Sequence, residues 1–220
     1  TAADLASDSY ITRELQKTGL PIISEDCACD ERARRNWDRF WLVDPLDGTK
    51  DFISHNGEFT VNIALVEYCS PTLGVIYAPA IDTLYFARKG VGSFLERNGN
   101  LVRLPTVHTD GSVVTISRQH LGETGKRFLA LNNIRDFRQR GSSLKFGILA
   151  EGAATLYPRF EGSMEWDIAA GHVIATEAGC SIVDLKTGNE PVYNKESMYN
   201  NPFIVYAPHV NYQELIFPEY

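Results

Sequence analysis

Two aspartates placed three positions apart carry the strongest chemical signal in the sequence. Asp44 and Asp47 belong to the segment WLVDPLDGT (residues 41–49), in which an apolar run gives way to a turn. The proline between them fixes φ, Gly48 permits a close backbone approach, and the amides of Gly48 and Thr49 can face an anion. Taken alone, this segment fits a metal- and phosphate-binding turn and an ordinary Asp-Pro/Asp-Gly surface turn equally well.

Two further acids stand where an element begins or ends. Glu25 follows the apolar run Ile22-Ile23, and Asp167 follows Trp166 at the start of a predicted helix. Singly, Glu25 fits a solvated strand end and Asp167 fits a charge that complements the helix dipole. Together with the first pair, they provide hard oxygen ligands of the kind that suits Mg²⁺. Two such ions can activate a water and hold the leaving oxygen of a phosphoryl transfer, so the sequence favours that chemistry.

The first half of the chain must position most of these acids. Apolar periodicity predicts a helix over residues 4–18, broken by Gly19 and Pro21. Leu5, Tyr10, Ile11 and Leu15 lie roughly on one face of it. Short runs bounded by Gly, Pro and Asp predict strands at 21–24, 40–43, 59–67, 73–78, 83–88 and 93–95. We expect an antiparallel sheet accompanied by helices.

The second half alternates strands with helices. Strands are predicted at 113–117, 136–138, 154–157, 181–184 and 203–206, and helices near 123–131, 142–151 and 167–177. Such alternation favours an α/β layer. We therefore predict an α+β metal-binding domain over residues 1–108 and an α/β nucleotide-binding domain over residues 109–220.

Composition limits the classes of protein that the chain can represent. Its 220 residues, 44% of them hydrophobic, suffice for one large domain or two small ones. With 28 acidic and 21 basic residues the net charge is -7, which argues against a basic face for a nucleic-acid polymer. No apolar run approaches the roughly 18 residues of a membrane span, and residues 1–25 lack a signal-peptide pattern. A soluble protein without an integral membrane span is expected.

The four cysteines do not form a disulfide or zinc framework. Cys27, Cys29, Cys69 and Cys180 are too few for a stapled scaffold and repeat no zinc spacing. We interpret them as thiols in a reducing compartment. A redox or metal pair at Cys27-x-Cys29 is a minor alternative, because no second Cys/His pair lies nearby.

The motifs together resemble those of the lithium-sensitive, Mg²⁺-dependent phosphatase superfamily. It includes inositol monophosphatases, fructose-1,6-bisphosphatases and 3′(2′),5′-bisphosphate nucleotidases. DPLDGT at 44–49 and WDIAAG at 166–171, followed by EAG, resemble its two signature motifs, and Thr1-x-x-Asp4 and Ser24-Glu25 its two shorter ones. All four follow the family's order, and the resemblance covers essentially the whole chain. It implies the layered αβαβα sandwich of that superfamily, an α+β to α/β fold.

Within the superfamily, the CysQ-type bisphosphate nucleotidases are the most similar. Lys50 follows Gly48-Thr49, and the segments 117–120, 141–145 and 157–159 resemble that subfamily's nucleotide-binding segments. The resemblance implies a cytoplasmic phosphoric monoester hydrolase of sulfate assimilation, with peripheral attachment to a bacterial inner membrane as a second expectation. It implies removal of the 3′-phosphate of adenosine 3′,5′-bisphosphate (PAP), giving AMP, with PAPS as a further candidate substrate giving APS.

The resemblance also implies a set of metal ligands. Glu25, Asp44 and the carbonyl of Leu46 would hold one Mg²⁺, and Asp44, Asp47 and Asp167 a second one. A third, mostly hydrated ion would lie near Glu25. Inhibition by Li⁺ is implied as well.

Catalytic and phosphate-binding groups follow from the same resemblance. Asp4 would accept the hydroxyl proton of Thr49, and Thr49 would help to orient the attacking water beside Asp47. The amides of Gly48 and Thr49 would bind phosphate oxygens as charge develops during transfer.

The nucleotide would be held by a separate group of residues. Lys145 and Arg159 would contact the 5′-phosphate, Ser142 would donate a hydrogen bond, and His120 would contact the adenine or the ribose. Without the resemblance, Lys145 fits a solvated helix residue and His120 a surface helix cap.

The sequence departs from the family pattern in three places. Relatives carry a further helical segment before Thr-x-x-Asp that this sequence does not include. Residues 26–36, rich in charge, are expected to form a mobile loop near Glu25. Lys50-Asp51 stands where Lys-Glu is usual.

Other functions remain open at this point. An inositol monophosphatase or sugar bisphosphatase of the same fold is disfavoured by Lys50 and by the Ser142/Lys145 segment. A non-catalytic nucleotide-binding homologue is disfavoured because every metal-ligand position holds its expected residue. A Ca²⁺-binding loop fails on the spacing of its acids. Family analogy allows a monomer or a homodimer.

Overall fold

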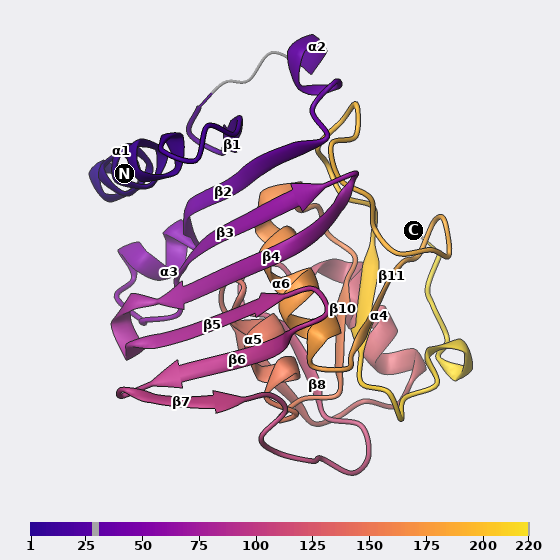
Figure 1. Cartoon of the computed structure of the whole chain (residues 1–220). Helices are drawn as coiled ribbons and strands as arrows, with labels where there is room; N and C mark the ends of the chain where they lie inside the picture. The colour runs from indigo at the N-terminus through magenta and orange to yellow at the C-terminus, as the bar shows by residue number, and fades with distance from the viewer. Residues whose placement is uncertain (28–30, 220) are drawn as a thin grey trace.

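The chain folds into two β-sheets with helices between and around them (Figure 1). The computed structural model describes residues 1–27 and 31–219. The elements of the first half are α1 (Ala2–Gln16), β1 (Ile22–Ser24), α2 (Glu31–Arg34), β2 (Arg39–Asp47), α3 (Thr49–Ile53), β3 (Thr60–Glu67), β4 (Ser70–Ala78), a 3₁₀ turn (Pro79–Ile81), β5 (Thr83–Arg88), β6 (Gly92–Arg97) and β7 (Asn100–Arg103). Those of the second half are β8 (Val114–Ser117), α4 (Gly122–Leu131), β9 (Phe137–Arg140), α5 (Leu144–Ala150), β10 (Leu156–Arg159), α6 (Glu165–Glu177), β11 (Ser181–Asp184), β12 (Phe203–Tyr206) and a 3₁₀ turn (Tyr212–Glu214).

The first sheet contains seven strands in sequence order, β1 to β7. Strands β2 to β7 pair antiparallel, as the turn-bounded runs predict. Strand β1 differs, because it pairs parallel to β2 with Ile22 opposite Trp41. Strand β7 was not predicted, since all four of its residues are exposed and no buried alternation marks it.

The second sheet has five strands in the order β11-β12-β10-β8-β9. Strands β8, β9 and β10 run parallel, and β12 lies antiparallel between β10 and β11. The predicted alternation of strands and helices is therefore confirmed in this half. The longest helix here, α6, follows the predicted span 167–177 closely.

Helices α5 and α6 lie between the two sheets (Figure 1). Helix α6 packs against β3, β4 and β5 of the first sheet, and its apolar residues join one core cluster with residues from both halves. The layered α+β architecture is confirmed. The predicted boundary near residue 108 falls in the connection from the first sheet to the second, but the division into two domains stays a prediction, because this core is shared.

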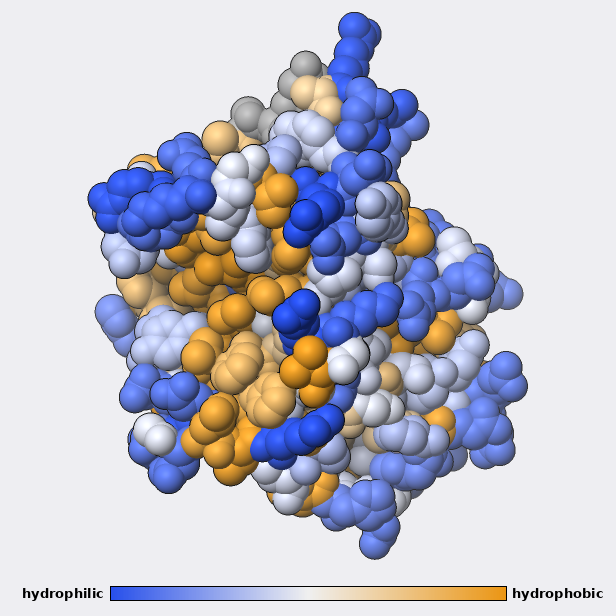
Figure 2. Space-filling view, viewed as in Figure 1, coloured by the Kyte–Doolittle hydropathy of each residue, from blue (hydrophilic) through white to orange (hydrophobic). Residues whose placement is uncertain are grey.

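The outer face of the seven-stranded sheet carries half-buried apolar side chains over β3 to β6, which Figure 2 shows as an orange area bordered by polar residues. Phe86 and Phe94 stack there with ring centroids 5.4 Å apart. Helix α1 lies along β1 and β2, yet Leu5 and Tyr10 of its predicted apolar face are each 61% exposed. The buried residue of this helix is Asp4. Within the described residues, no helix has the length and apolar character needed to cross a membrane.

Candidate active site

Strand β2 ends in an irregularity that turns Asp44 and Asp47 to the same side. Asp44 lies opposite Asn62 and Asp47 opposite Thr60, so β2 advances three residues while β3 advances two. In a regular strand, side chains three positions apart point to opposite faces, and one extra residue restores them to one face. The sequence DPLD therefore brings its two carboxylates together through a β-bulge.

The parallel pairing of β1 brings Glu25 beside the same bulge. Ser24 lies opposite Val43, and the amide of Glu25 donates to the carbonyl of Val43 over 3.1 Å. Because two parallel strands end at the same edge of a sheet, Glu25 reaches Asp44, and their carboxyl groups share a hydrogen bond. Helix α1 is tied to this edge by Ser7, whose hydroxyl donates to the carbonyl of Pro45 over 2.8 Å.

Asp167 reaches the cluster from the first turn of α6. Its carboxylate accepts a hydrogen bond from the amide of Met164 over 2.8 Å, which satisfies one free N–H at the helix start. Asp44, Asp47 and Asp167 thus come from an irregular strand end and a helix N-terminus, the two kinds of place where the sequence located them.

A buried polar chain fixes the orientation of Asp47. The Ser143 hydroxyl lies 2.9 Å from Asp47 Oδ2 and 2.7 Å from the carbonyl of Asp167. The amide of Asn62 donates to Ser143 over 2.9 Å and to Asp47 over 3.3 Å. Thr60 in turn donates to the Asn62 carbonyl oxygen over 3.0 Å, which sets the direction of the amide. Sequence reasoning missed Asn62 and Ser143; the one signal for Asn62 is an amide at an inward position of the alternating strand TVNIALVE.

The carboxylates repel one another in a buried setting. Burial, followed by the charges of Asp47, Asp167 and Glu25, holds the pKa of Asp44 well above its usual range. Burial and the charge of Asp47 raise the pKa of Asp167 to about 7. The pKa of Glu25 is raised too, mainly by burial. Among the residues that the structure describes, no ion pair reaches Asp44, Asp47 or Asp167.

This donor set fits a divalent cation with hard oxygen ligands. Carboxylate oxygens are what Mg²⁺ prefers, and a cation would offset the mutual repulsion of the cluster. In the described parts of the chain, however, no three His, Cys, Asp or Glu side chains converge in a ready-made ligating arrangement. One oxygen each of Asp44, Asp47 and Asp167 is turned to a hydrogen-bond donor of the protein instead. An ionised carboxylate has about four lone-pair sites, so these hydrogen bonds orient the three carboxylates and still leave sites for a cation.

A cleft of about 360 Å³ opens beside this cluster. Its lining includes Asp47, Asp167 and the start of α3, which we call the acidic end, and the cations Lys145 and Arg159, which we call the basic end. Gly48 allows the turn at the acidic end, because its φ is 89° and a Cβ there would lie 3.3 Å from both the Glu58 carbonyl and the Ser142 Cβ. Helix α3, which starts directly after it, was not predicted.

The cations at the basic end are buried and already hydrogen-bonded. Lys145 is 3% exposed; its ammonium donates to the carbonyl of Ser142 and, over 3.4 Å, to that of Arg140. Burial lowers the pKa of Lys145 to about 8. Arg159 donates to the carbonyls of Glu161 and Gly162 over 3.0 and 2.9 Å. Both cations are therefore held in place by backbone carbonyls.

Two more predicted residues line the cleft. The Ser142 hydroxyl is buried and has no hydrogen-bond partner among the described residues, although it stands at the cleft wall. His120 lines the cleft, and its pKa is lowered by burial and then by the positive charges of Arg159, Lys50 and Lys145. A neutral imidazole and an unpaired hydroxyl are both suited to contact a polar ligand.

Most of the predicted site residues gather at one place. Those that line the cleft are Asp47, Gly48, Thr49, His120, Ser142, Lys145, Arg159 and Asp167. Asp44 and Leu46 belong to the same strand end as Asp47, and Glu25 adjoins that strand. The predicted pairing of Asp4 with Thr49 stays a prediction, since the hydrogen bonds given for Asp4 go to Thr1.

The predicted mobile loop, residues 26–36, and the cysteine pair are described only in part, because residues 28–30 lie outside the described residues. The loop 26–36 contains α2, whose Arg34 is buried and bonded to Asn194 and to the carbonyls of Lys195 and Glu196. Cys29 lies outside the described residues. Cys27 and Cys69 are exposed free thiols and Cys180 is a buried one.

Comparison with known proteins connects this site to a family. The sequence profile of the inositol monophosphatase family matches residues 1–219. The 3′(2′),5′-bisphosphate nucleotidase CysQ of Buchnera aphidicola is 43% identical over 86% of this chain and 72% of that protein. CysQ of Salmonella typhimurium is 41% identical over 93% of this chain and 84% of its own length. The crystal structure of CysQ from Bacteroides thetaiotaomicron superposes with a TM-score of 0.82 at 40% identity, covering 89% of this chain and 80% of that one.

Proposed function

The chain belongs to the inositol monophosphatase family, and from this premise we propose that it is a 3′(2′),5′-bisphosphate nucleotidase. As a phosphoric monoester hydrolase, it removes the 3′-phosphate of PAP and leaves AMP. One observation carries the proposal: a single cleft joins a carboxylate cluster to a pair of buried cations. A substrate with two phosphates needs both ends, and the CysQ relatives, at 41–43% identity, are named for that substrate class.

Mg²⁺ is the cofactor of this family, and the acidic end is where it would bind. Glu25, Asp44 and the Leu46 carbonyl would hold one ion, and Asp44, Asp47 and Asp167 another. The ions would polarise the phosphoryl oxygens and lower the pKa of the attacking water. We propose two or three ions and competition by Li⁺.

The protein's own groups at the acidic end position the phosphate. Gly48 and Thr49 line the cleft at the start of α3, and their amides would donate to phosphoryl oxygens as charge develops. The Thr49 hydroxyl orients the attacking water, and Asp4 accepts the hydroxyl proton of Thr49. Ser143 and Asn62 keep Asp47 in one orientation, because each holds its Oδ2.

The basic end selects a second phosphate. Lys145 and Arg159 supply two positive charges whose side chains are already ordered, so little conformational entropy is lost when an anion binds. The unpaired Ser142 hydroxyl supplies a donor, and His120 contacts the ribose or base. An inositol monophosphate has no second phosphate that could bind to Lys145 and Arg159.

Other parts of the proposal follow from the family. PAPS is a second substrate, giving APS. The enzyme acts in the cytoplasm, with a peripheral attachment to the inner membrane as an additional possibility for a bacterial protein, and as a monomer or homodimer.

The test is phosphate release from PAP with Mg²⁺, with and without millimolar Li⁺, beside inositol 1-phosphate as parallel substrate. Release from PAP that is faster than from inositol 1-phosphate, requires Mg²⁺ and falls with Li⁺ would support the proposal. Faster release from inositol 1-phosphate would overturn the assigned substrate. Calorimetric binding of PAP without release from either substrate would instead indicate a nucleotide-binding protein that does no chemistry.

A further inference from the structure

An exposed aromatic ring stands at the rim of the cleft beside its basic end. Tyr199 lines the same cleft as Arg159 and Lys145, and 57% of the residue is exposed. It belongs to the loop between β11 and β12. The motifs of the sequence do not include it, and the function proposed above assigns it no role.

The backbone that carries this ring is fixed on both sides. Tyr199 forms an isolated antiparallel bridge with Met164, the residue before α6. The next residue, Asn200, donates from its backbone N–H to the Ser163 carbonyl over 2.8 Å. Its side-chain amide donates to the Met164 carbonyl over 2.7 Å. The backbone at Tyr199 is therefore held by Ser163 and Met164, the residues that precede α6, the helix that carries Asp167.

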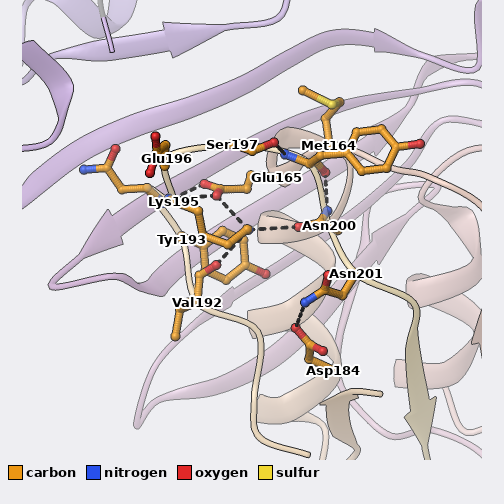
Figure 3. A network of polar contacts seen from close by, with 12 residues as sticks. Met164, Glu165, Asp184, Val192, Tyr193, Lys195, Glu196, Ser197, Asn200 and Asn201 are labelled. Carbon is orange, nitrogen blue, oxygen red and sulfur yellow. Dashed lines mark hydrogen bonds and ion pairs between the residues drawn. The ribbon is translucent and has the colours of Figure 1, made fainter. Parts of the chain in front are cut away.

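A buried carboxylate holds the rest of the loop. Glu165 is fully buried and accepts hydrogen bonds from the amides of Asn194 and Lys195 over 2.6 and 3.0 Å, and from the Lys195 ammonium over 2.7 Å. The same ammonium also bonds to Asn200 over 3.2 Å. Figure 3 shows Glu165, Lys195 and Asn200 meeting in one network. The loop is thus preorganised, and its aromatic side chain can serve a ligand at small entropic cost.

Gly162 leaves the space that the ring occupies. A Cβ at this position would lie 1.3 Å from the Tyr199 hydroxyl oxygen, so any side chain would displace the ring. The carbonyl of Gly162 also accepts the 2.9 Å hydrogen bond from Arg159. One short stretch of backbone therefore adjoins both the guanidinium and the aromatic ring.

We propose that Tyr199 is the stacking surface for the nucleobase of the substrate. The proposal rests on the function proposed above and deepens it. With one phosphate at Asp47 and Gly48 and the other at Arg159, the sugar spans the cleft, and its base projects to the rim where Tyr199 stands. The faces of nucleobases are apolar and stack on aromatic rings, and removing such a ring weakens binding by about tenfold or more.

The test compares PAP with a bisphosphate that lacks the base, the 3,5-bisphosphate of an abasic ribose. Tyr199→Ala should raise the KM for PAP about tenfold while kcat stays within about twofold, and should leave the KM for the abasic substrate unchanged. Tyr199→Phe should behave as the wild type, because stacking needs the ring and not the hydroxyl. Tyr10→Ala removes an equally exposed tyrosine from α1 and should change neither substrate.

Two results would overturn the assignment. Equal increases of KM for both substrates would mean that Tyr199 only shapes the cleft, and no change for PAP would mean that the base lies elsewhere. Failure of the proposed function is recognised separately, because the wild type would then not release phosphate from PAP. AMP binding measured by calorimetry still tests the ring in that case: weaker binding by Tyr199→Ala but not by Tyr199→Phe supports stacking, and unchanged binding contradicts it.

Discussion

The two ends of the cleft differ in how their charges are balanced. At the acidic end Asp44 is buried and Asp167 half-buried beside other carboxylates, and burial and mutual repulsion raise the pKa of each. At the basic end Lys145 and Arg159 are buried too, but carbonyl oxygens of the backbone accept their hydrogen bonds. Backbone carbonyls hold the cations in place, whereas the carboxylates repel one another and an added cation would offset that repulsion.

This difference separates binding from chemistry. The basic end can receive an anion once the chain has folded, whereas the acidic end reaches its working state only when cations offset the repulsion between its carboxylates. Substitutions at the acidic end should therefore act on kcat and Mg²⁺ dependence, and substitutions at the basic end on the KM of the bisphosphate.

The largest effect is expected at Asp47. Asp47→Asn keeps the size of the side chain and can still accept from Ser143, but it removes a charge that the cation needs. We expect kcat for PAP to fall at least about 100-fold, since the loss of metal-borne charge stabilisation costs several kcal/mol. The circular dichroism spectrum should stay that of the wild type. Asp110→Asn, an exposed aspartate outside the cleft, is the control and should keep full activity.

Near-normal turnover by Asp47→Asn would remove this residue from the metal site. It would also abolish the contrast between the two ends, because the acidic end would then work without its most central charge.

Two neighbouring serines, Ser142 and Ser143, allow a substitution that affects the metal site to be compared with one that does not. Ser143→Ala removes the hydroxyl that lies between Asp47 and the Asp167 carbonyl, so the Mg²⁺ concentration for half-maximal activity should rise about 10-fold or more. Ser142→Ala removes a hydroxyl that has no hydrogen-bond partner among the described residues and should leave the Mg²⁺ requirement unchanged. Mg²⁺ titrations of both variants at saturating PAP make the measurement. Equal shifts in the two variants would contradict the division.

At the basic end, Lys145 should give substrate affinity a pH dependence. Burial lowers the pKa of its ammonium to about 8, so the charged form is present below that pH and is lost as the pH rises through it. The KM for PAP should therefore increase above about pH 8. Lys145→Met should raise this KM about tenfold at pH 7, because a hydrogen bond to a charged group is lost, and should flatten its rise with pH.

The substrate 3′-AMP provides the comparison for this prediction, because it lacks the 5′-phosphate. Its KM should change little in Lys145→Met. If PAP and 3′-AMP are weakened alike, Lys145 supports the structure of the cleft and does not bind the second phosphate.

The sequence predicted the chemical groups better than the geometry that joins them. The segment DPLDGT and the start of the helix at Asp167 were predicted from residue types and from the Gly and Pro residues that bound the elements. The bulge that turns Asp44 and Asp47 to one side was not, because it depends on pairing with β3. The parallel pairing of β1 was missed as well, since a three-residue strand carries no signal of its direction.

Contacts across long stretches of chain were also beyond reach. Asn62 bonds to Ser143, 81 positions away, and nothing in the sequence pairs the two residues. Tyr199 reaches the cleft only because the loop that carries it pairs with Met164. Local patterns report periodicity and turns, whereas these residues acquire their roles from packing between the two halves.

The smallest expected effect concerns stability without metal. The pKa of Asp44 is raised in the folded state, so at neutral pH, above its unfolded value, the ionised carboxylate destabilises the fold. Asp44→Asn should therefore stabilise the metal-free protein, by roughly the 1 kcal/mol that a single substitution commonly changes. In Mg²⁺ the wild type should be the more stable protein, because binding of the ion raises its free energy of unfolding and the variant binds the ion more weakly. Urea unfolding in EDTA and in Mg²⁺ makes both measurements, with Asp110→Asn as the control. A variant that is less stable than the wild type in EDTA would show that the hydrogen bonds of Asp44 to Glu25 and to the Leu46 amide outweigh the repulsion, and the acidic end would then be as self-sufficient as the basic one.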